Sequence, residues 1–159
     1  MTAMFKAEER ARRIEANVSA LIARNASDDG LRRTNATHED WDPIRVLAHV
    51  AEFLPYWAAQ AKDVAERRSN GQPFGRTHTD PARIAAIEDH AHDELAPTVA
   101  RLRSALAGSV ALLRSIPDDA WTKTGTHARR GEMTIEQVVD QLMCDHLLEH
   151  LTQADALKV

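Results

Sequence analysis

Two histidines, His146 and His150, are four residues apart in a segment with helical periodicity, and this spacing suits metal coordination. On an α-helix, side chains at positions i and i+4 lie one turn apart on the same face, where two imidazoles can share one ion. The same face carries apolar residues, namely Val139, Leu142, Met143 and Leu147. The sequence therefore predicts that both histidines point into a hydrophobic core.

A third histidine, His49, lies between Val46 and Phe53 on the apolar face of another predicted helix. A buried polar group without a hydrogen-bond partner costs about 1–3 kcal/mol. Because one ion would satisfy all three rings at once, we predict that His49, His146 and His150 hold a divalent metal ion. The alternative is that each is an ordinary core histidine with a backbone or carboxylate partner. Three imidazoles leave open coordination positions for water or substrate, which is typical of a catalytic site.

The remaining histidines are expected at the surface, at the rim of the core or in solvated connections: His38, His78, His90, His92 and His127. Asp140 and Asp145 are expected to be solvated as well. Glu149 is expected at the surface, with the alternative that it orients a metal ligand. Cys144 lies on nearly the opposite side of the helix from His146, so we count it neither as a ligand nor as a nucleophile.

Residues 146–150 also match the HxxEH pattern of inverted zinc proteases. We set this interpretation aside, because that motif belongs to an α/β domain that supplies a further ligand downstream. Gln153 continues the face of His146, and it either orients a ligand or a bound water or is a polar residue at the rim of the core.

The elements that would position these residues are helices. Apolar residues repeat every three or four positions over four segments, at about residues 3–26, 43–68, 81–115 and from 135 nearly to the C-terminus. The second segment has strong start signals, because Asp42 is a good N-cap and Pro43 suits the first helical position. Trp41 can also pack onto Val46 across this start as a hydrophobic staple.

Prolines, loop-forming residues and capping residues mark the boundaries of the other segments. Pro97 is expected to split the third helix into a shorter and a longer piece. Residues 69–75 are predicted to form a loop, as is the polar stretch after Asp119. Thr134 and Gln137 form a capping box at the start of the last helix.

The helix pattern indicates an all-α protein, a four-helix bundle with connections of about ten to twenty residues. Connections of this length argue against a simple up-down-up-down order. The 159 residues, 43% of them hydrophobic, are expected to form a single domain over residues 1–159.

The composition limits the partners and the compartment. The chain has 24 acidic and 20 basic residues and a formal net charge of -4, so it offers no basic footprint for nucleic acid or an anionic membrane. A single cysteine, Cys144, cannot form an internal disulfide, which suits a reducing compartment. We see no signal-peptide pattern and no apolar run of membrane-span length, so we expect a cytoplasmic protein.

Several stretches together resemble the DinB-like family: WDPIRVLAHVAEF at residues 41–53, GEMTI at 131–135, DHLLEHLTQ at 145–153 and the helix end at 113–117. The resemblance implies a four-helix bundle with a crossed connection. It also implies a homodimer, and a site for nickel, zinc or iron formed by one histidine of the second helix and an HxxxH pair of the fourth. In this chain those positions fall on three residues: His49, His146 and His150.

The resemblance also implies a range of functions. Some members are metal-dependent transferases and isomerases that use a low-molecular-weight thiol such as mycothiol, bacillithiol or glutathione. We therefore expect a thiol-dependent S-transferase or isomerase acting on a small electrophile, and the 16 arginines against four lysines hint at a GC-rich genome and so at mycothiol. The alternatives are a noncatalytic metal-binding stress-response protein and a metal-dependent hydrolase. The sequence shows no thiol-binding motif and identifies no general acid or base.

Overall fold

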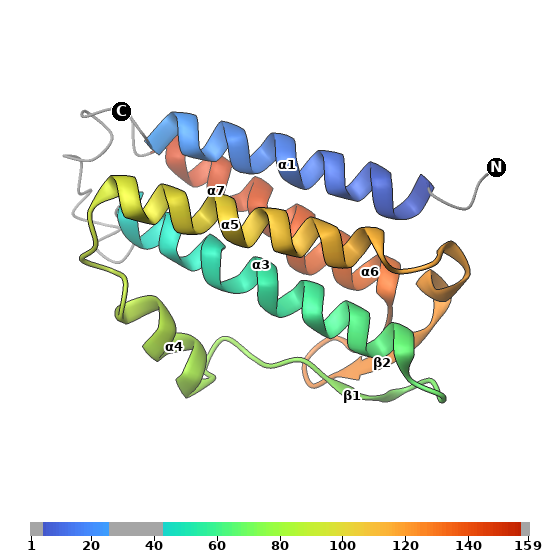
Figure 1. Cartoon of the computed structure of the whole chain (residues 1–159). Coiled ribbons are helices and arrows are strands. Elements are labelled where there is room, and N and C mark those ends of the chain that lie inside the picture. The colour runs from blue at the N-terminus through green and yellow to red at the C-terminus, as the bar shows by residue number, and fades with distance from the viewer. Residues whose placement is uncertain (1–4, 26–42, 157–159) are drawn as a thin grey trace.

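The computed structural model describes residues 5–25 and 43–156 (Figure 1). Within these ranges, four helical segments run side by side, and the first three are α1 (Phe5–Asn25), α3 (Pro43–Glu66) and α5 (Leu95–Arg114). The fourth consists of α6 (Ile135–Val139), the π-helical turn η3 (Asp140–Cys144) and α7 (Asp145–Ala156). The expected start signals at Trp41 and Asp42 lie outside the described residues.

The helices pack as a bundle in which α3 lies along α5, and α1 contacts both α5 and α7. Figure 1 shows that α3 and α5 run in the same direction, so the chain between them returns along the length of the bundle. This return carries the short strand β1 (Gln72–Phe74) and the helix α4 (Pro81–Glu88). The expected crossed connection stays a prediction, because the segment that joins α1 to α3 is not among the described residues.

The core lies where the helical periodicity placed it. Ile14, Val18 and Leu21 of α1 are fully buried, and so are Leu102 and Leu113 of α5. Burial of a large aliphatic side chain stabilises a fold by about 1.5–3 kcal/mol, so these stripes hold the bundle together. No helix in the described ranges is long and apolar enough to cross a membrane.

The third predicted helix is divided at a different place than expected. α4 ends at Glu88 and α5 begins at Leu95, so the break precedes Pro97. Pro97 lies in the first turn of α5, where a backbone N–H has no partner within the helix and its loss costs little. The side chain of Asp80 caps α4 by accepting a hydrogen bond from the backbone N–H of Arg83 at 3.0 Å.

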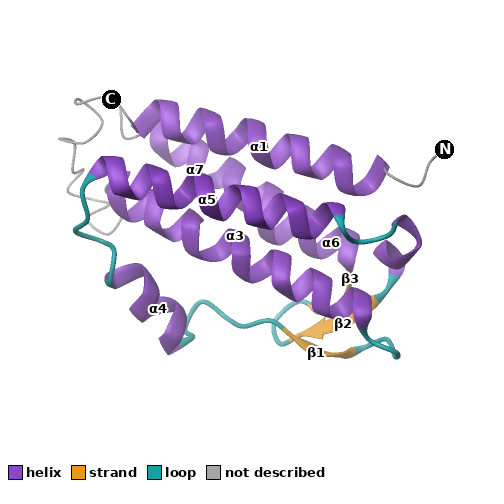
Figure 2. Ribbon diagram, in the orientation of Figure 1, coloured by secondary structure: helices purple, strands orange, loops and turns teal. Residues whose placement is uncertain are grey.

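Two segments predicted to be loops contain strands, so the protein is mostly helical and not all-α. β1 pairs in parallel with β2 (Thr124–His127), and β2 pairs antiparallel with β3 (Gly131–Thr134). Figure 2 shows this small sheet beside the C-terminal end of α3. Gly125 is required in β2, because a Cβ there would lie 2.7 Å from Cδ1 of Phe74.

The last helical segment starts as predicted but is not continuous. Thr134 Oγ1 accepts a hydrogen bond from Gln137 N at 3.1 Å, and Gln137 Oε1 accepts one from Thr134 N at 2.9 Å, which confirms the capping box. After α6 the backbone widens into the π-helical turn η3, with hydrogen bonds spanning five residues. Such turns often occur near functional sites, and this one ends two residues before His146.

Candidate metal centre

The structure brings together the three histidines singled out from the sequence. His49 projects from α3, and His146 and His150 project from α7. His49 and His150 are only 2% and 4% exposed, and His146 is half-buried. One ring nitrogen from each of the three lies within 4.8 Å of the others.

The closest pair of nitrogens has a spacing that fits a shared ion. Nε2 of His49 lies 3.3 Å from Nε2 of His146. Two nitrogens that bind the same tetrahedral zinc ion, each at about 2.0–2.1 Å, are about 3.3–3.4 Å apart. Imidazole nitrogens are suitable ligands for zinc, nickel and iron. The three histidines therefore form a cluster that could hold a divalent metal ion.

Phe53 packs against the cluster and restricts how the rings can turn. Its ring is stacked on that of His146, with centroids 4.4 Å apart and planes 10° apart. The centroid of His49 lies 5.1 Å from that of Phe53. Because Phe53 is itself 1% exposed, the imidazoles are held in place by the core of the bundle.

The electrostatic surroundings keep the rings neutral. Burial, together with the charges of His150 and His146, lowers the pKa of His49 to about 2. Burial lowers the pKa of His146 to about 3, with contributions from the charges of His150, Arg83 and Arg130. A neutral imidazole has a nitrogen lone pair for a metal ion, so both rings are in the ligand form at neutral pH.

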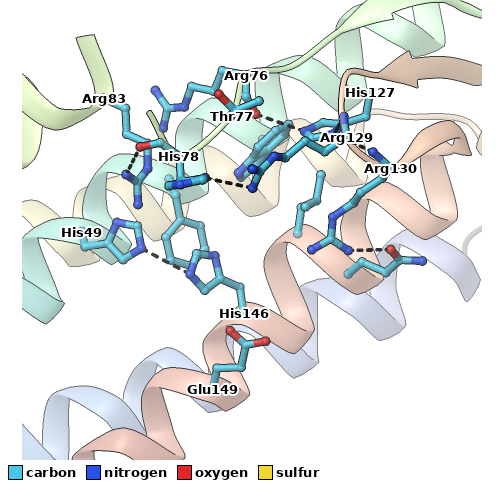
Figure 3. Close-up of a pocket in the computed structure, with 14 residues that line it drawn as sticks. His49, Arg76, Thr77, His78, Arg83, His127, Arg129, Arg130, His146 and Glu149 are labelled. Atoms are coloured by element: carbon cyan, nitrogen blue, oxygen red, sulfur yellow. Dashed lines mark hydrogen bonds between the residues drawn. The ribbon is translucent and has the colours of Figure 1, made fainter. Parts of the chain in front are cut away.

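A pocket of about 220 Å³ opens beside His49 and His146 (Figure 3). Its wall comes from α3, from the chain before and at the start of α4, from the β2–β3 turn and from the last helical segment. Four arginines line it: Arg76, Arg83, Arg129 and Arg130. No local pattern in the sequence singles out these residues, because they lie in separate segments that are brought together only by the fold.

His127 corrects one prediction, because it was expected to be solvated and is only 5% exposed. Its Nε2 donates to the carbonyl oxygen of Arg76 at 3.0 Å, and its Nδ1 accepts from the backbone N–H groups of Arg129 and Arg130 at 3.1 and 3.3 Å. The ring therefore fixes the β2–β3 turn against the chain before α4. An unrecognised strand, β2, is the reason the sequence analysis missed it.

The other histidines follow the expectation more closely. His78 is exposed, although it lines the pocket, and His92 is exposed. His90 is half-buried, with Nδ1 2.7 Å from a carboxylate oxygen of Asp93. His38 lies outside the described residues.

The remaining candidates near the histidine pair have mixed outcomes. Glu149 is exposed as predicted and also lines the pocket. Cys144 is buried, and burial raises the pKa of its thiol to about 11, which argues against a nucleophile. Asp140 was expected to be solvated, but it is half-buried and accepts hydrogen bonds from the Arg10 guanidinium. Asp145 is exposed, and the side chain of Gln153 lies outside the described part of the chain.

A helical bundle with three histidines from two of its helices suggests a family, and a family model confirms it. This chain belongs to the DinB superfamily, whose model matches residues 10–154. No curated protein matches the chain significantly.

Two solved structures share the fold. YfiT from Bacillus subtilis, described as a probable metal-dependent hydrolase with an unusual four-helix bundle topology, has a TM-score of 0.74 and 16% identity, over 95% of this chain and 85% of YfiT. The mycothiol-dependent maleylpyruvate isomerase has a TM-score of 0.66 and 15% identity, over 93% of this chain. The chain spans only 62% of the length of that isomerase. At such identities these likenesses show the fold.

Proposed function

We propose that this protein is a metal-dependent enzyme in which His49, His146 and His150 hold a divalent zinc, nickel or iron ion. It transfers a low-molecular-weight thiol of the mycothiol or bacillithiol type to a small electrophile, or uses that thiol to isomerise one. The observation that carries the proposal is the convergence of three imidazoles from two helices, two of them with nitrogens 3.3 Å apart. A bound divalent ion would lower the pKa of a thiol and make its thiolate available near neutral pH.

The residues of the chain supply the rest of the site. The neutral ring nitrogens are the ion ligands, and Phe53 holds two of the rings in orientation. The pocket of about 220 Å³ beside His49 and His146 has room for a small electrophile. A second pocket of about 420 Å³, partly lined by Ile84 and Ile87, also reaches His49. Two neighbouring pockets, which share His49, His78 and Arg83, therefore offer space for two reactants.

The relatives support a reaction at a metal site but differ in the chemistry. YfiT is described as a probable metal-dependent hydrolase, and the isomerase is mycothiol-dependent. A metal-dependent hydrolase is therefore the second candidate for this protein, with water in place of the thiol. We further propose a homodimer that acts on a small molecule in the cytoplasm without nucleic acid or membrane partners. Light scattering that shows only monomer at micromolar concentration would contradict the dimer.

Metal content and turnover test the proposal together. Elemental analysis should find a divalent metal in the purified protein and far less in the His49→Ala, His146→Ala and His150→Ala variants. The exposed His92→Ala variant is the matched control and should keep its metal. A panel of small electrophiles and esters is then incubated with and without mycothiol or bacillithiol.

The outcomes separate the candidate functions. Turnover that needs both metal and thiol supports the S-transferase or isomerase, whereas turnover with water alone supports the hydrolase. Metal binding without turnover of any compound supports a noncatalytic metal-binding protein. If the three variants retain the metal of the unmodified protein, the histidine site itself is wrong.

A further inference from the structure

We infer that the pocket beside the three histidines binds the carboxylate or phosphate group of a small anionic substrate through Arg83, Arg129 and Arg130. This inference rests on the proposed function and deepens it, since it names the substrate class of the same site. The electrophile would carry an oxyanion, which the arginines hold while its reactive part faces His49 and His146.

The charge of the pocket is unlike that of the whole protein. The chain has a formal net charge of -4, yet the pocket is lined by four arginines and a single carboxylate, that of Glu149. Arg76 already has a partner, because it forms an ion pair with Glu52 and lies over the ring of Tyr56 at 3.7 Å. The three other arginines account for the excess of positive charge.

These three guanidinium groups contact neutral atoms. Arg83 donates to the backbone carbonyl oxygen of His78 at 2.8 Å. Nη1 of Arg129 lies 3.3 Å from Nδ1 of the His78 ring. Arg130 donates to Oε1 of Gln141 at 2.8 Å. Among the described residues, none of the three has a carboxylate oxygen within the 4.0 Å of an ion pair. Each guanidinium has five N–H donors, so most of them remain available to a ligand.

The backbone that carries the two exposed arginines, Arg129 and Arg130, is held in place without a ligand. His127 accepts from the backbone N–H groups of Arg129 and Arg130, and this fixes the turn that carries them. Arg83 comes from the opposite wall, on α4, and is half-buried. Figure 3 shows the side chain of Arg83 from α4 and those of Arg129 and Arg130 from the β2–β3 turn around the space next to His49 and His146. Positioned donors lose less conformational entropy when they bind, which favours a tight and oriented complex.

An anion would relieve an unfavourable arrangement. Burial lowers the pKa of Arg83 and the neighbouring charge of Arg76 lowers it further, while the charges of Glu52 and Asp80 oppose this shift without cancelling it. A negative group beside Arg83 would favour its charged form, and a planar carboxylate or a phosphate can accept two parallel hydrogen bonds from one guanidinium. A neutral molecule of the same shape would leave the charges uncompensated, so the pocket should select against it.

Calorimetric titration of the full chain, in zinc-loaded and metal-free forms at constant ionic strength, tests the inference with succinate, phosphate and the neutral analogue succinamide. We expect succinate, phosphate or both to bind to the two forms, and succinamide to bind to neither. A preference for succinate or for phosphate identifies which oxyanion the site recognises. Arg83→Gln and Arg130→Gln should each weaken binding about tenfold, as expected for loss of a charge-assisted hydrogen bond.

Arg103→Gln is the matched control, because Arg103 is exposed on α5, does not line the pocket and carries the same charge. It should leave the affinity within about twofold, since exposed charges at a distance are screened by salt. Circular dichroism of each variant confirms that it is folded. Equal weakening by Arg103→Gln would show a nonspecific attraction and overturn the inference.

Two further results would overturn it. The first is that neither anion binds to the folded, unmodified protein. The second is that succinate and phosphate bind only when zinc is present, and bind the Arg83→Gln and Arg130→Gln variants as well as the unmodified protein. The second result would make the anion a ligand of the metal alone. The metal-free titration requires no turnover, so anion binding by an inactive protein counts against the proposed function only. Thiol-dependent turnover without anion binding counts against the arginine site only.

Discussion

Two groups of arginines on either side of η3 differ in their partners: Arg10 and Arg13 on the α1 side pair with carboxylates, and three of the pocket arginines on the other side contact neutral groups. On one side, Arg10 of α1 is 6% exposed and donates to both carboxylate oxygens of Asp140, at 2.7 and 2.9 Å, and to Glu136 at 2.8 Å. On the other side, the pocket arginine Arg130 donates to the neutral side chain of Gln141. Two adjacent residues of η3 therefore have different surroundings. Asp140 neutralises the charge of Arg10, whereas Gln141 lies at the pocket whose positive charge is not compensated.

The difference separates two uses of the same residue type. A buried guanidinium surrounded by carboxylates joins α1 to the last helical segment, and its charge is already satisfied. A guanidinium whose partners are a carbonyl or an amide adds little to the fold but keeps its charge for a ligand. The comparison therefore predicts that stability depends on the Arg10 side of η3 and that binding depends on the pocket side.

The largest effect should come from the pocket side, at a metal ligand. His146→Ala should weaken zinc binding about 100-fold or more, because loss of a residue that merely supports a ligand already costs 10–100-fold. The stabilisation by excess zinc should shrink accordingly, by about 2.7 kcal/mol for a 100-fold loss of affinity, and the zinc-induced rise in Tm should shrink with it. Competition with a chromophoric chelator measures the affinity, with His92→Ala as control. An unchanged zinc affinity would show that His146 is not a ligand of the metal.

The next effect belongs to the other side of η3. Arg10→Gln should destabilise the protein by about 2–3 kcal/mol, because Asp140 and Glu136 lose a buried cation but remain partly open to solvent. For a chain of this size the Tm should fall by about 5–10 °C in thermal unfolding followed by circular dichroism. Succinate affinity of the folded variant should not change. A Tm equal to that of the unmodified protein would contradict the prediction that stability depends on the Arg10 side of η3.

A smaller effect is expected at His127, which connects the pocket arginines to the fold. His127→Ala removes an acceptor for two backbone N–H groups and a donor to the Arg76 carbonyl. Stability should fall by about 1–2 kcal/mol, the cost of hydrogen bonds lost in a buried region. Succinate binding should also weaken about threefold, since Arg129 and Arg130 are no longer held in place. Weaker stability with unchanged binding would show that the turn needs no support.

The smallest effect on stability should come from Arg83→Gln, the same chemical change as at Arg10. The substitution loses the hydrogen bond to His78 and the attraction to Glu52 and Asp80, but it also removes the cost of burying a charge and the repulsion with Arg76, so stability should stay within about 0.5 kcal/mol. The measured Tm should therefore lie within about 2 °C of that of the unmodified protein. A fall as large as that of Arg10→Gln would give the two arginine groups the same structural role.

The histidine cluster could be predicted from the sequence because its signals are local. The i, i+4 spacing places His146 and His150 on one side of their helix, and the apolar neighbours of His49 indicate a buried face, without knowledge of the tertiary fold. The capping box at Thr134 and Gln137 is equally local, and it was confirmed. That the three rings bind metal stays a prediction for the experiments above.

The missed features depend on contacts between distant segments. The strands are three or four residues long, too short for an alternating pattern, and β1 and β2 pair across about 50 residues. The burial of His127 and the gathering of Arg83 with Arg130 both follow from that pairing and from the return of the chain past α4. The prediction that Pro97 divides the third helix was wrong about the position, because a proline is tolerated in the first turn of a helix and the break precedes it.

The π-helical turn between the two groups of arginines has a consequence for the angular position of the histidines. Each residue of an α-helix advances about 100° around the axis, and a π turn accommodates one extra residue without that advance. If residues 135–156 formed one uninterrupted α-helix, His146 and His150 would be rotated by about 100° relative to α6 and would no longer point toward His49 as they do here. The widened turn thus sets the rotational phase of the last helix, so that Glu136 meets Arg10 while the histidine pair, farther along the same axis, meets α3.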